Sequence, residues 1–172
     1  MELPNNGPAP ASVLFVCLGN ICRSPLAEGV FRHLVAEHGL AHAFRIESAG
    51  TGGWHVGEAP DGRASVVAAN HGIVLESRAQ QVTAGDLQDF DIVLAMDREN
   101  LRTLQRLDEA QGGGASIHLL REFDPHTEDG DEVPDPYYGG PSGFENVYQM
   151  VRRSCEGLLR HLQATTQVGW SR

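Results

Sequence analysis

Short apolar runs recur along the chain and are separated by longer stretches of helical periodicity. Apolar residues dominate 13–16 and 90–95, while 44–48 alternate between apolar and polar positions and 116–120 form a last short run. Runs of this length, rich in β-branched and aromatic residues, are typical of strands. The pattern therefore predicts four strands: Val13–Cys17, Phe44–Ser48, Phe90–Ala95 and Ser116–Leu120.

A segment of helical periodicity follows each strand. Leu26 and Val30 begin an apolar stripe after the first strand, and comparable stripes mark three later segments: 61–71, 101–107 and 142–162. The last segment opens with Ser142 and Glu145 at the spacing of a capping box. Strands that alternate with helices predict an α/β fold: an open four-stranded parallel sheet with right-handed crossovers and helices on both faces.

The 172-residue chain has no linker-like segment, so we expect a single domain from residue 12 to residue 166. Residues 1–11 are rich in Pro, Asn and Gly and predict a flexible tail, and residues 167–172 are assigned to a C-terminal tail. Residues 1–11 also lack the basic start and apolar middle of a signal peptide. No apolar run approaches the roughly 18 residues that a membrane span needs.

The net charge and the number of cysteines restrict the kinds of partner and the cellular compartment that we expect. A formal net charge of −10 disfavours nucleic acid and anionic membrane surfaces as partners. The three cysteines, an odd number set around a motif rather than in a disulfide framework, favour the reducing cytoplasm. The eight histidines lack metal-ligand clustering, and His71 near a helix end is expected to be structural. We therefore expect a cytoplasmic monomer that uses no metal and no cofactor.

The loop between the first strand and the first helix carries the candidate chemistry. In an open parallel sheet, anions bind where such a loop reaches a helix N-terminus. Cys17 ends the strand and Arg23 follows six positions later, so the thiol should lose its proton easily and the guanidinium should grip two oxyanion oxygens. Gly19 and Asn20 suit positive φ or a side-chain-braced turn, which lets backbone amides converge on one point. The Ser24 hydroxyl can hydrogen-bond the sulfur.

At this loop the sequence resembles a known family. Residues 17–25 read CLGNICRSP, which looks like the signature of the low-molecular-weight protein tyrosine phosphatases, and the family's second motif appears as DPYYGG at 135–140. The similarity also runs through three intervening segments: 48–51, 59–64 and 95–97. It covers about 13–162, and two distant motifs in the right order make it a specific signal.

The resemblance implies a protein tyrosine phosphatase that hydrolyses phosphotyrosine and aryl phosphate monoesters through a phosphocysteine intermediate. Cys17 is then the nucleophile, Arg23 stabilises the phosphoryl oxygens, and Asp135 is the general acid that later activates water. The partners would be a tyrosine-phosphorylated protein and phosphate as product, with no nucleic acid and no membrane. Nine further residues are expected to bind phosphate or substrate: Leu18, Gly19, Asn20, Ile21, Cys22, Ser24, Trp54, Tyr137 and Tyr138.

Structural alternatives accompany the candidate cysteines and the acid. Cys17 can be read as a small buried hydrophobe at a strand end, and Asp135 before a proline as a turn initiator. Cys22 either fills space in the loop or serves as a redox partner for Cys17. Cys155 lies on the apolar stripe of the last helix and is expected in the core.

The candidate aromatic and bracing residues have alternatives as well. Trp54, in a glycine-rich segment, either walls the binding site or packs into the core. Tyr137 and Tyr138 either stack on an aromatic leaving group or pack on the core. Asp61 and Asp97 match family positions that brace the loop, or are surface carboxylates.

Three other functions compete with the phosphotyrosine phosphatase. An arsenate reductase of the same fold needs cysteines in mid-chain, and none lies between Cys22 and Cys155. A phosphoarginine phosphatase is expected to carry Thr at the position of Ile21. A non-catalytic phosphate-binding module would not need intact catalytic residues. The sequence also departs from the family at Ser77 and Gln80, where His and Arg are common.

Overall fold

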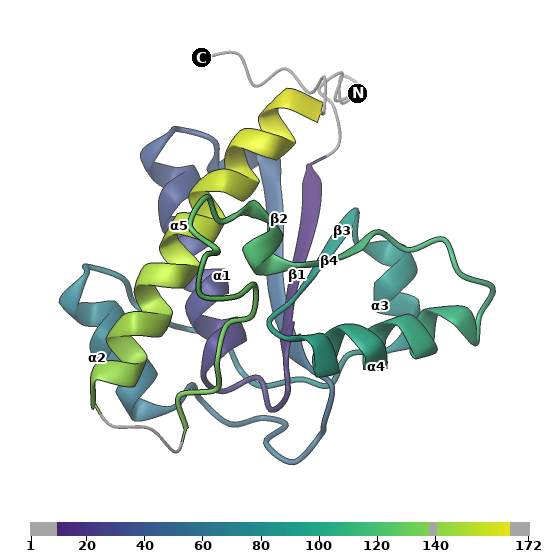
Figure 1. The fold of residues 1–172 in the computed structure, drawn as a ribbon, viewed down its shortest axis with the longest axis horizontal. Helices are drawn as coiled ribbons and strands as arrows, with labels where there is room; N and C mark the ends of the chain where they lie inside the picture. The colour runs from purple at the N-terminus through teal and green to yellow at the C-terminus, as the bar shows by residue number, and fades with distance from the viewer. Residues whose placement is uncertain (1–9, 138–140, 166–172) are drawn as a thin grey trace, which may run out of the picture.

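The computed structural model describes residues 10–137 and 141–165, so the prediction for Tyr138 and those for 1–9 and 167–172 lie outside the described residues. The predicted four-stranded sheet is confirmed. Its strands pair in the order β2-β1-β3-β4, and every pairing is parallel (Figure 1). The strands are β1 (Ala11–Cys17), β2 (Phe44–Gly50), β3 (Ile92–Ala95) and β4 (Ile117–Leu119).

The four predicted helices are present, and three shorter elements accompany them. The predicted helices are α1 (Arg23–Glu37), α2 (Gly62–Asn70), α4 (Arg98–Glu109) and α5 (Pro141–Thr165). The additional elements are η1 (Ala41–Ala43), α3 (Ala84–Asp89) and η2 (Leu120–Phe123). Helix α3 has no apolar stripe because Leu87 is its one buried residue, and it begins instead with a capping box of Thr83 and Asp86.

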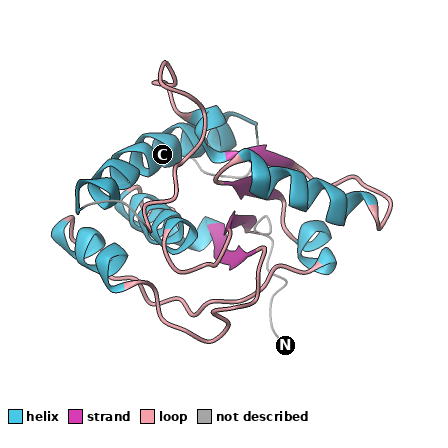
Figure 2. Ribbon diagram, turned by 60° about the horizontal axis from the view of Figure 1, so that its bottom comes forward, coloured by secondary structure: helices cyan, strands magenta, loops and turns pink. Residues whose placement is uncertain are grey.

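Alternation along β1 separates two hydrophobic clusters. Val13 and Phe15 pack with residues of α1, α2 and α5, whereas Leu14 and Val16 pack with residues of α3 and α4. Successive side chains of a strand point to opposite faces, so this central strand needs a cover on both sides. The helices accordingly lie on both faces of the sheet (Figure 2).

Two boundary predictions are wrong. Strand β1 begins at Ala11, which was assigned to the tail, because Ala11 is buried and pairs with Phe44 of β2. Helix α5 begins at Pro141, so Ser142 lies inside the first turn and does not form the predicted capping box. Proline suits a first helical turn because it has no N–H to satisfy. The Glu145 side chain pairs with His71 instead.

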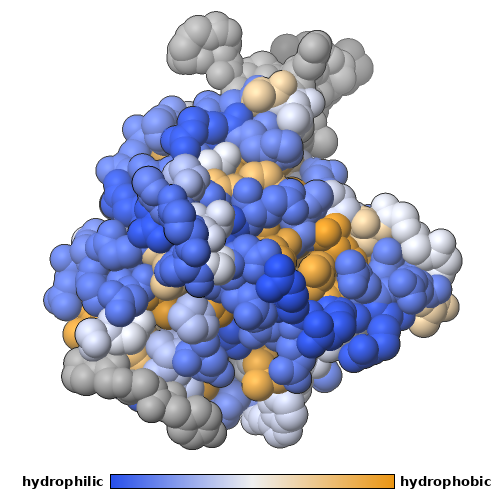
Figure 3. Space-filling model, in the orientation of Figure 1, coloured by the Kyte–Doolittle hydropathy of each residue, from blue (hydrophilic) through white to orange (hydrophobic). Residues whose placement is uncertain are grey.

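The outer surface is mostly polar. Figure 3 shows a largely hydrophilic face with small hydrophobic areas between the polar ones. Helix α5 is the longest described helix, but it is amphipathic, and its buried side includes Phe144, Val151 and Leu158. Within residues 10–137 and 141–165, no helix combines the length and apolarity needed to cross a bilayer.

The carboxyl ends of β1, β2 and β3 lie at one edge of the sheet, at the lower edge of Figure 1. The chain leaves β1 toward β2 on one side and places β3 on the other, so strand order reverses beside the end of β1. Ligands of open α/β sheets bind outside the carboxyl ends of strands at such a switch point. The loop after β1 occupies this position.

Candidate active site

The loop 18–22 joins β1 to α1 and turns sharply at Asn20. Asn20 has φ of 57°, the one positive φ of a non-glycine residue in the described part of the chain. Its buried amide donates to Ser24 Oγ (2.7 Å) and Ser48 Oγ (3.0 Å) and accepts from the Gln80 backbone N–H (2.9 Å). Because Gln80 contributes a backbone N–H here, this brace does not depend on which side chain occupies the position.

Of the two residues expected to suit positive φ or a side-chain-braced turn, Asn20 shows both features, whereas Gly19 is not among the glycines in the left-handed region. The absence of a side chain serves another purpose. A Cβ at Gly19 would lie 3.0 Å from the His55 ring, so glycine lets His55 approach the loop. His55 was missed by the sequence analysis, although it directly follows Trp54.

Hydrogen bonds to the loop carbonyls orient its peptide planes. The carbonyl oxygens of Cys17 and Leu18 accept from the N–H groups of residues 51 and 52 (both 2.9 Å), and that of Ile21 accepts from the Asp61 N–H (2.7 Å). In a trans peptide the N–H points opposite to the carbonyl. The N–H groups that follow these carbonyls therefore point to the other side of the loop, an arrangement that suits an anion.

Cys17 lies at the bottom of the loop, with its Sγ 3.0 Å from Ser24 Oγ. Arg23 is 3% exposed, and its Nη1 donates to Asp97 Oδ2 (2.7 Å) and to the Val133 carbonyl (3.0 Å). Burial alone would lower the pKa of Arg23, but Cys17 and the hydrogen-bonded Asp97 raise it above its usual value. A buried, permanently charged guanidinium thus lies beside the thiol.

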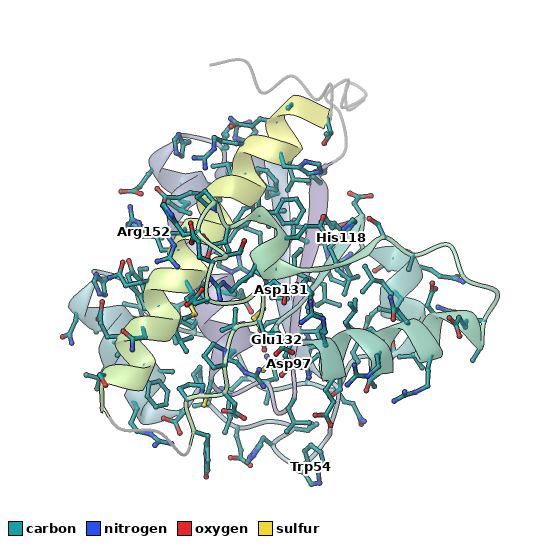
Figure 4. The ribbon with its side chains drawn as sticks, in the orientation of Figure 1. Trp54, Asp97, His118, Asp131, Glu132 and Arg152 are labelled. Carbon is teal, nitrogen blue, oxygen red and sulfur yellow. The ribbon has the colours of Figure 1, made fainter. Side chains whose placement is uncertain are left out.

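Asp135 reaches the same place from the other end of the sequence. Its Oδ2 lies 3.8 Å from Arg23 Nη2, and its Oδ1 accepts from the Tyr137 N–H (3.0 Å). Two residues earlier, the buried Val133 donates its N–H to the Met96 carbonyl (2.8 Å) and accepts from Arg23. Figure 4 labels Asp97, Asp131 and Glu132, which mark the start of α4 and the segment that leads to Asp135.

Cys17, Arg23 and Asp135 line one open cavity of about 210 Å³. Seven more residues complete its wall: Leu18, Gly19, Ile21, Cys22, Trp54, His55 and Tyr137. Asn20 and Ser24, also expected at the site, are buried and do not line the cavity. The cavity is therefore polar at its base and apolar or aromatic at its rim.

Trp54 is 70% exposed, so the alternative in which it packs into the core is wrong (Figure 4). Its ring lies against the chain at Gly52, where an added Cβ would meet the indole at 1.8 Å. Only glycine permits this close approach. Tyr137, also at the rim, faces the Arg63 guanidinium 5.0 Å from its ring centroid.

Asp61 and Asp97 both contact residues of the anion-binding loop, Ile21 and Arg23 respectively, so neither is a plain surface carboxylate. Asp61 caps α2 and pairs with Arg63, which lowers its pKa mainly through that side-chain hydrogen bond. Arg63 in turn donates to the Tyr137 carbonyl (2.9 Å). Asp97 caps α4 through its bond with the Asn100 N–H (2.8 Å) while its other oxygen holds Arg23. Each acid thus fixes a helix start and a site residue together.

The three cysteines are free thiols. Burial, with a smaller contribution from Asp61, raises the pKa of Cys22 to about 12, so this thiol is protonated at neutral pH. Cys155 is fully buried between α5 and α1, as expected of a core residue. His71 stacks on Tyr148 (3.7 Å between centroids), which agrees with a structural role.

Among the described side chains, no group of three or more His, Cys, Asp or Glu is arranged to hold a metal ion. The positive charge at the cavity base comes from Arg23 and from the helix N-terminus. Both are suited to hold an oxyanion.

Comparisons with known proteins identify the family. The profile of the low molecular weight phosphotyrosine protein phosphatases matches residues 12–168. A Streptomyces coelicolor low molecular weight protein-tyrosine-phosphatase is 49% identical over 148 residues, which cover 86% of this chain and 90% of that protein.

Solved structures agree with the sequence match. The crystal structure of YfkJ from Bacillus subtilis superposes with a TM-score of 0.86 at 40% identity, covering 93% of this chain and 99% of that one. The Drosophila arginine phosphatase DARP superposes with a TM-score of 0.84 at 34% identity, covering 90% and 99%. The chain therefore belongs to the low molecular weight phosphotyrosine protein phosphatase family.

Proposed function

We propose that this protein is a cysteine-dependent protein tyrosine phosphatase that hydrolyses phosphotyrosine and aryl phosphate monoesters. The observation that carries the proposal is the convergence of Cys17, Arg23 and Asp135 on one cavity from opposite ends of the chain. A thiol, a bidentate cation and a carboxylic acid are the groups that a two-step phosphoryl transfer needs.

In the first step the Cys17 thiolate attacks phosphorus in line. An S–P bond forms as the bond between phosphorus and the leaving oxygen breaks. Arg23 and the loop N–H groups hold the three equatorial oxygens, on which negative charge is distributed in the transition state. Asp135 gives its proton to the leaving phenol oxygen, which prevents release of an unstable phenoxide.

In the second step a water molecule attacks the phosphocysteine. Asp135, now ionised, accepts a proton from that water while the S–P bond breaks and inorganic phosphate forms. Ser24 stabilises the departing thiolate, since its hydroxyl lies 3.0 Å from Cys17 Sγ. The cycle returns Cys17 as a thiolate and Asp135 as an acid.

The rim of the cavity favours an aromatic leaving group. Trp54 and Tyr137 present rings at the entrance, and Ile21 adds an apolar side chain to the wall. A flat phenyl ring gains from such surfaces, whereas the polar guanidinium of phosphoarginine would need hydrogen-bond partners there. Ile21 thus favours phosphotyrosine over phosphoarginine, the substrate class that the name of the Drosophila relative suggests.

A substrate comparison tests the proposal. The wild-type protein should hydrolyse a phosphotyrosine peptide and p-nitrophenyl phosphate, and should act much more slowly on a phosphoarginine peptide. Ile21→Thr should shift this ratio toward phosphoarginine. Faster hydrolysis of phosphoarginine by the wild type would assign the chain to that other substrate class, and no hydrolysis of any phosphate would favour a binding module.

Cys22 is proposed as a redox partner for Cys17. Both thiols line the same cavity, and the negative charge of Cys17 contributes to the raised pKa of Cys22, which reflects their proximity. Oxidation of Cys17 by peroxide gives a sulfenic acid, and attack by Cys22 on that sulfur releases water and forms a disulfide. A reducing compartment such as the cytoplasm would keep the enzyme active, and a tyrosine-phosphorylated protein is the partner we expect.

A further inference from the structure

Arg121 is a buried cation outside the cavity. It lies in η2, immediately after β4, and is 2% exposed. A charge buried to this degree is costly unless hydrogen bonds satisfy it. Its guanidinium accordingly makes four hydrogen bonds, and these bonds divide between an anchor and a loop.

The anchor is Asp124, whose side chain is also buried. Arg121 Nε donates to Asp124 Oδ2 (3.0 Å), and Arg153 of α5 donates to both Asp124 oxygens (3.1 and 3.2 Å). Burial alone would raise the pKa of Asp124, but the bonds from Arg153, the His126 N–H and Arg121 lower it. Arg121 is thereby fixed to the long helix α5 by an ionised carboxylate.

The other edge of the guanidinium holds the loop that runs from 124 to 135. Nη1 donates to the Glu132 carbonyl (3.0 Å), while Nη2 donates to the His126 carbonyl (2.7 Å) and to Asp129 Oδ1 (3.0 Å). His126 and Glu132 are on opposite limbs of the loop. One planar group therefore closes the loop and ties both limbs to the anchor.

This closure lies close to Asp135 along the chain. Glu132, labelled in Figure 4, directly precedes Val133, the buried residue whose carbonyl accepts from Arg23. Only Pro134 then separates Val133 from Asp135, and proline restricts φ to about −65°. Arg121 therefore holds the chain at Glu132, next to the contacts of Val133 with Met96 and Arg23, and a short, stiff connection leads from there to Asp135.

We propose that Arg121 is a positioning residue for Asp135. It closes the 124–135 loop on Asp124 and so fixes where the carboxyl lies relative to the leaving oxygen. The inference rests on the proposed function, in which Asp135 is the general acid. A lysine cannot replace Arg121, because one ammonium group cannot span the carboxylate and two carbonyls in a fixed plane.

The test compares Arg121→Lys and Arg121→Met with the wild type on aryl phosphates of graded leaving group. With a very acidic phenol, where the acid contributes little, kcat/KM, which reports the step in which the leaving group departs, should fall no more than about threefold. With phenyl phosphate it should fall roughly 10- to 100-fold, because a displacement of about 1 Å can cost that much and a positioned acid contributes about 10²–10⁴-fold.

Arg153→Met is the matched control. Arg153 contacts the same Asp124 but none of the loop carbonyls that Arg121 holds, so its loss disturbs the anchor without opening the loop. Its kcat/KM should fall by the same factor on all leaving groups. Thermal melting shows whether each variant is folded. If Arg121→Met does not fold, Arg121→Lys, which keeps the buried charge, tests the positioning role by itself.

A double-mutant cycle with Asp135→Asn separates positioning from general damage. In the Asp135→Asn background, Arg121→Lys should cause no further loss on phenyl phosphate, since there is no acid left to position. Additive losses, or a loss independent of leaving group, would overturn the positioning role. If Asp135→Asn alone loses the same factor of activity on every aryl phosphate, Asp135 is not the general acid. That result is distinct from the one that would overturn the positioning role of Arg121.

Discussion

The thiol of Cys17 and the guanidinium of Arg23 divide the work of the site between reaction and binding. Cys17 supplies the attacking sulfur, while Arg23 is held by Asp97 and the Val133 carbonyl, contacts that do not involve Cys17. Cys17→Ser should therefore lose hydrolysis by at least about 10³-fold yet still bind vanadate or phosphate. Calorimetry and turnover of p-nitrophenyl phosphate check this, and substantial turnover by the variant would exclude the covalent mechanism.

Arg23→Lys tests how much the guanidinium contributes to binding the phosphoryl group. An ammonium group can keep one of the two contacts that Arg23 makes, but it cannot also present a fork to the phosphoryl oxygens. We expect kcat/KM to fall roughly 100-fold or more, together with weaker phosphate binding. If Arg23→Lys kept a kcat/KM close to that of the wild type, the loop N–H groups alone would be sufficient to stabilise the phosphoryl oxygens.

The Cys22 thiol allows a third residue-scale prediction. Mild peroxide should inactivate the enzyme, phosphate should protect it, and a thiol reductant should restore activity. Because burial raises the pKa of Cys22, little of this thiol is ionised at neutral pH, and disulfide formation should quicken as the pH rises. Cys22→Ser should be inactivated too, but should recover poorly because Cys17 oxidises beyond the sulfenic acid. Full recovery of Cys22→Ser would assign Cys22 to loop packing alone.

At the scale of elements, helix starts position the site. Asp97 uses one oxygen to cap α4 and the other to hold Arg23, whereas an asparagine has a single acceptor oxygen. If Asp97→Asn keeps the bond to Arg23, it should lose the helix cap and about 1 kcal/mol of stability. If it keeps the cap instead, it should lose the bond to Arg23 and kcat/KM should fall roughly tenfold. Denaturant melts and kinetics on one preparation measure both, and a variant unchanged in both would contradict the shared role.

Elements with repeated apolar positions could be predicted from the sequence, and elements without them could not. The four predicted helices bury one face, which leaves a periodic pattern, while β1 and β3 are buried throughout and read as continuous apolar runs. Helix α3 buries Leu87 alone and was missed. Cys17 and Arg23 were found from their spacing after a strand, and Asp135 was found through the resemblance to the family. Arg121 was not, because its partners include backbone carbonyls, which no residue type reveals.

At the scale of the whole molecule, the buried arginines join parts of the chain that are distant in sequence. Arg23 links β1 and α1 to Val133, and Arg121 links η2 to the same segment one residue earlier. Each arginine also pairs with a carboxylate, Asp97 for the first and Asp124 for the second. The segment that carries Asp135 is therefore held by ion pairs on two different elements.

The stability of the protein in acid tests how much the Asp124 carboxylate contributes to the fold. The native structure holds the pKa of Asp124 below its usual value, so the unfolded chain binds protons more readily. The resulting stabilisation is fully present above about pH 4, the ordinary range of an aspartate, and is lost as pH falls through the native pKa. Asp124→Asn, which cannot ionise, should be less stable than the wild type at pH 7 but should lose less on acidification. The two curves should thus approach each other.

Urea unfolding at intervals from pH 7 to pH 2 measures the effect as the change in the free energy of unfolding. The exposed Glu109 provides the matched control, since Glu109→Gln removes a carboxylate that is not buried and should run parallel to the wild type. Phosphate-analogue binding by wild type should weaken over the same acidic interval, because the 124–135 loop loosens when Asp124 is protonated. Parallel curves for Asp124→Asn and wild type would show that the Arg121–Asp124 pair contributes nothing to acid stability.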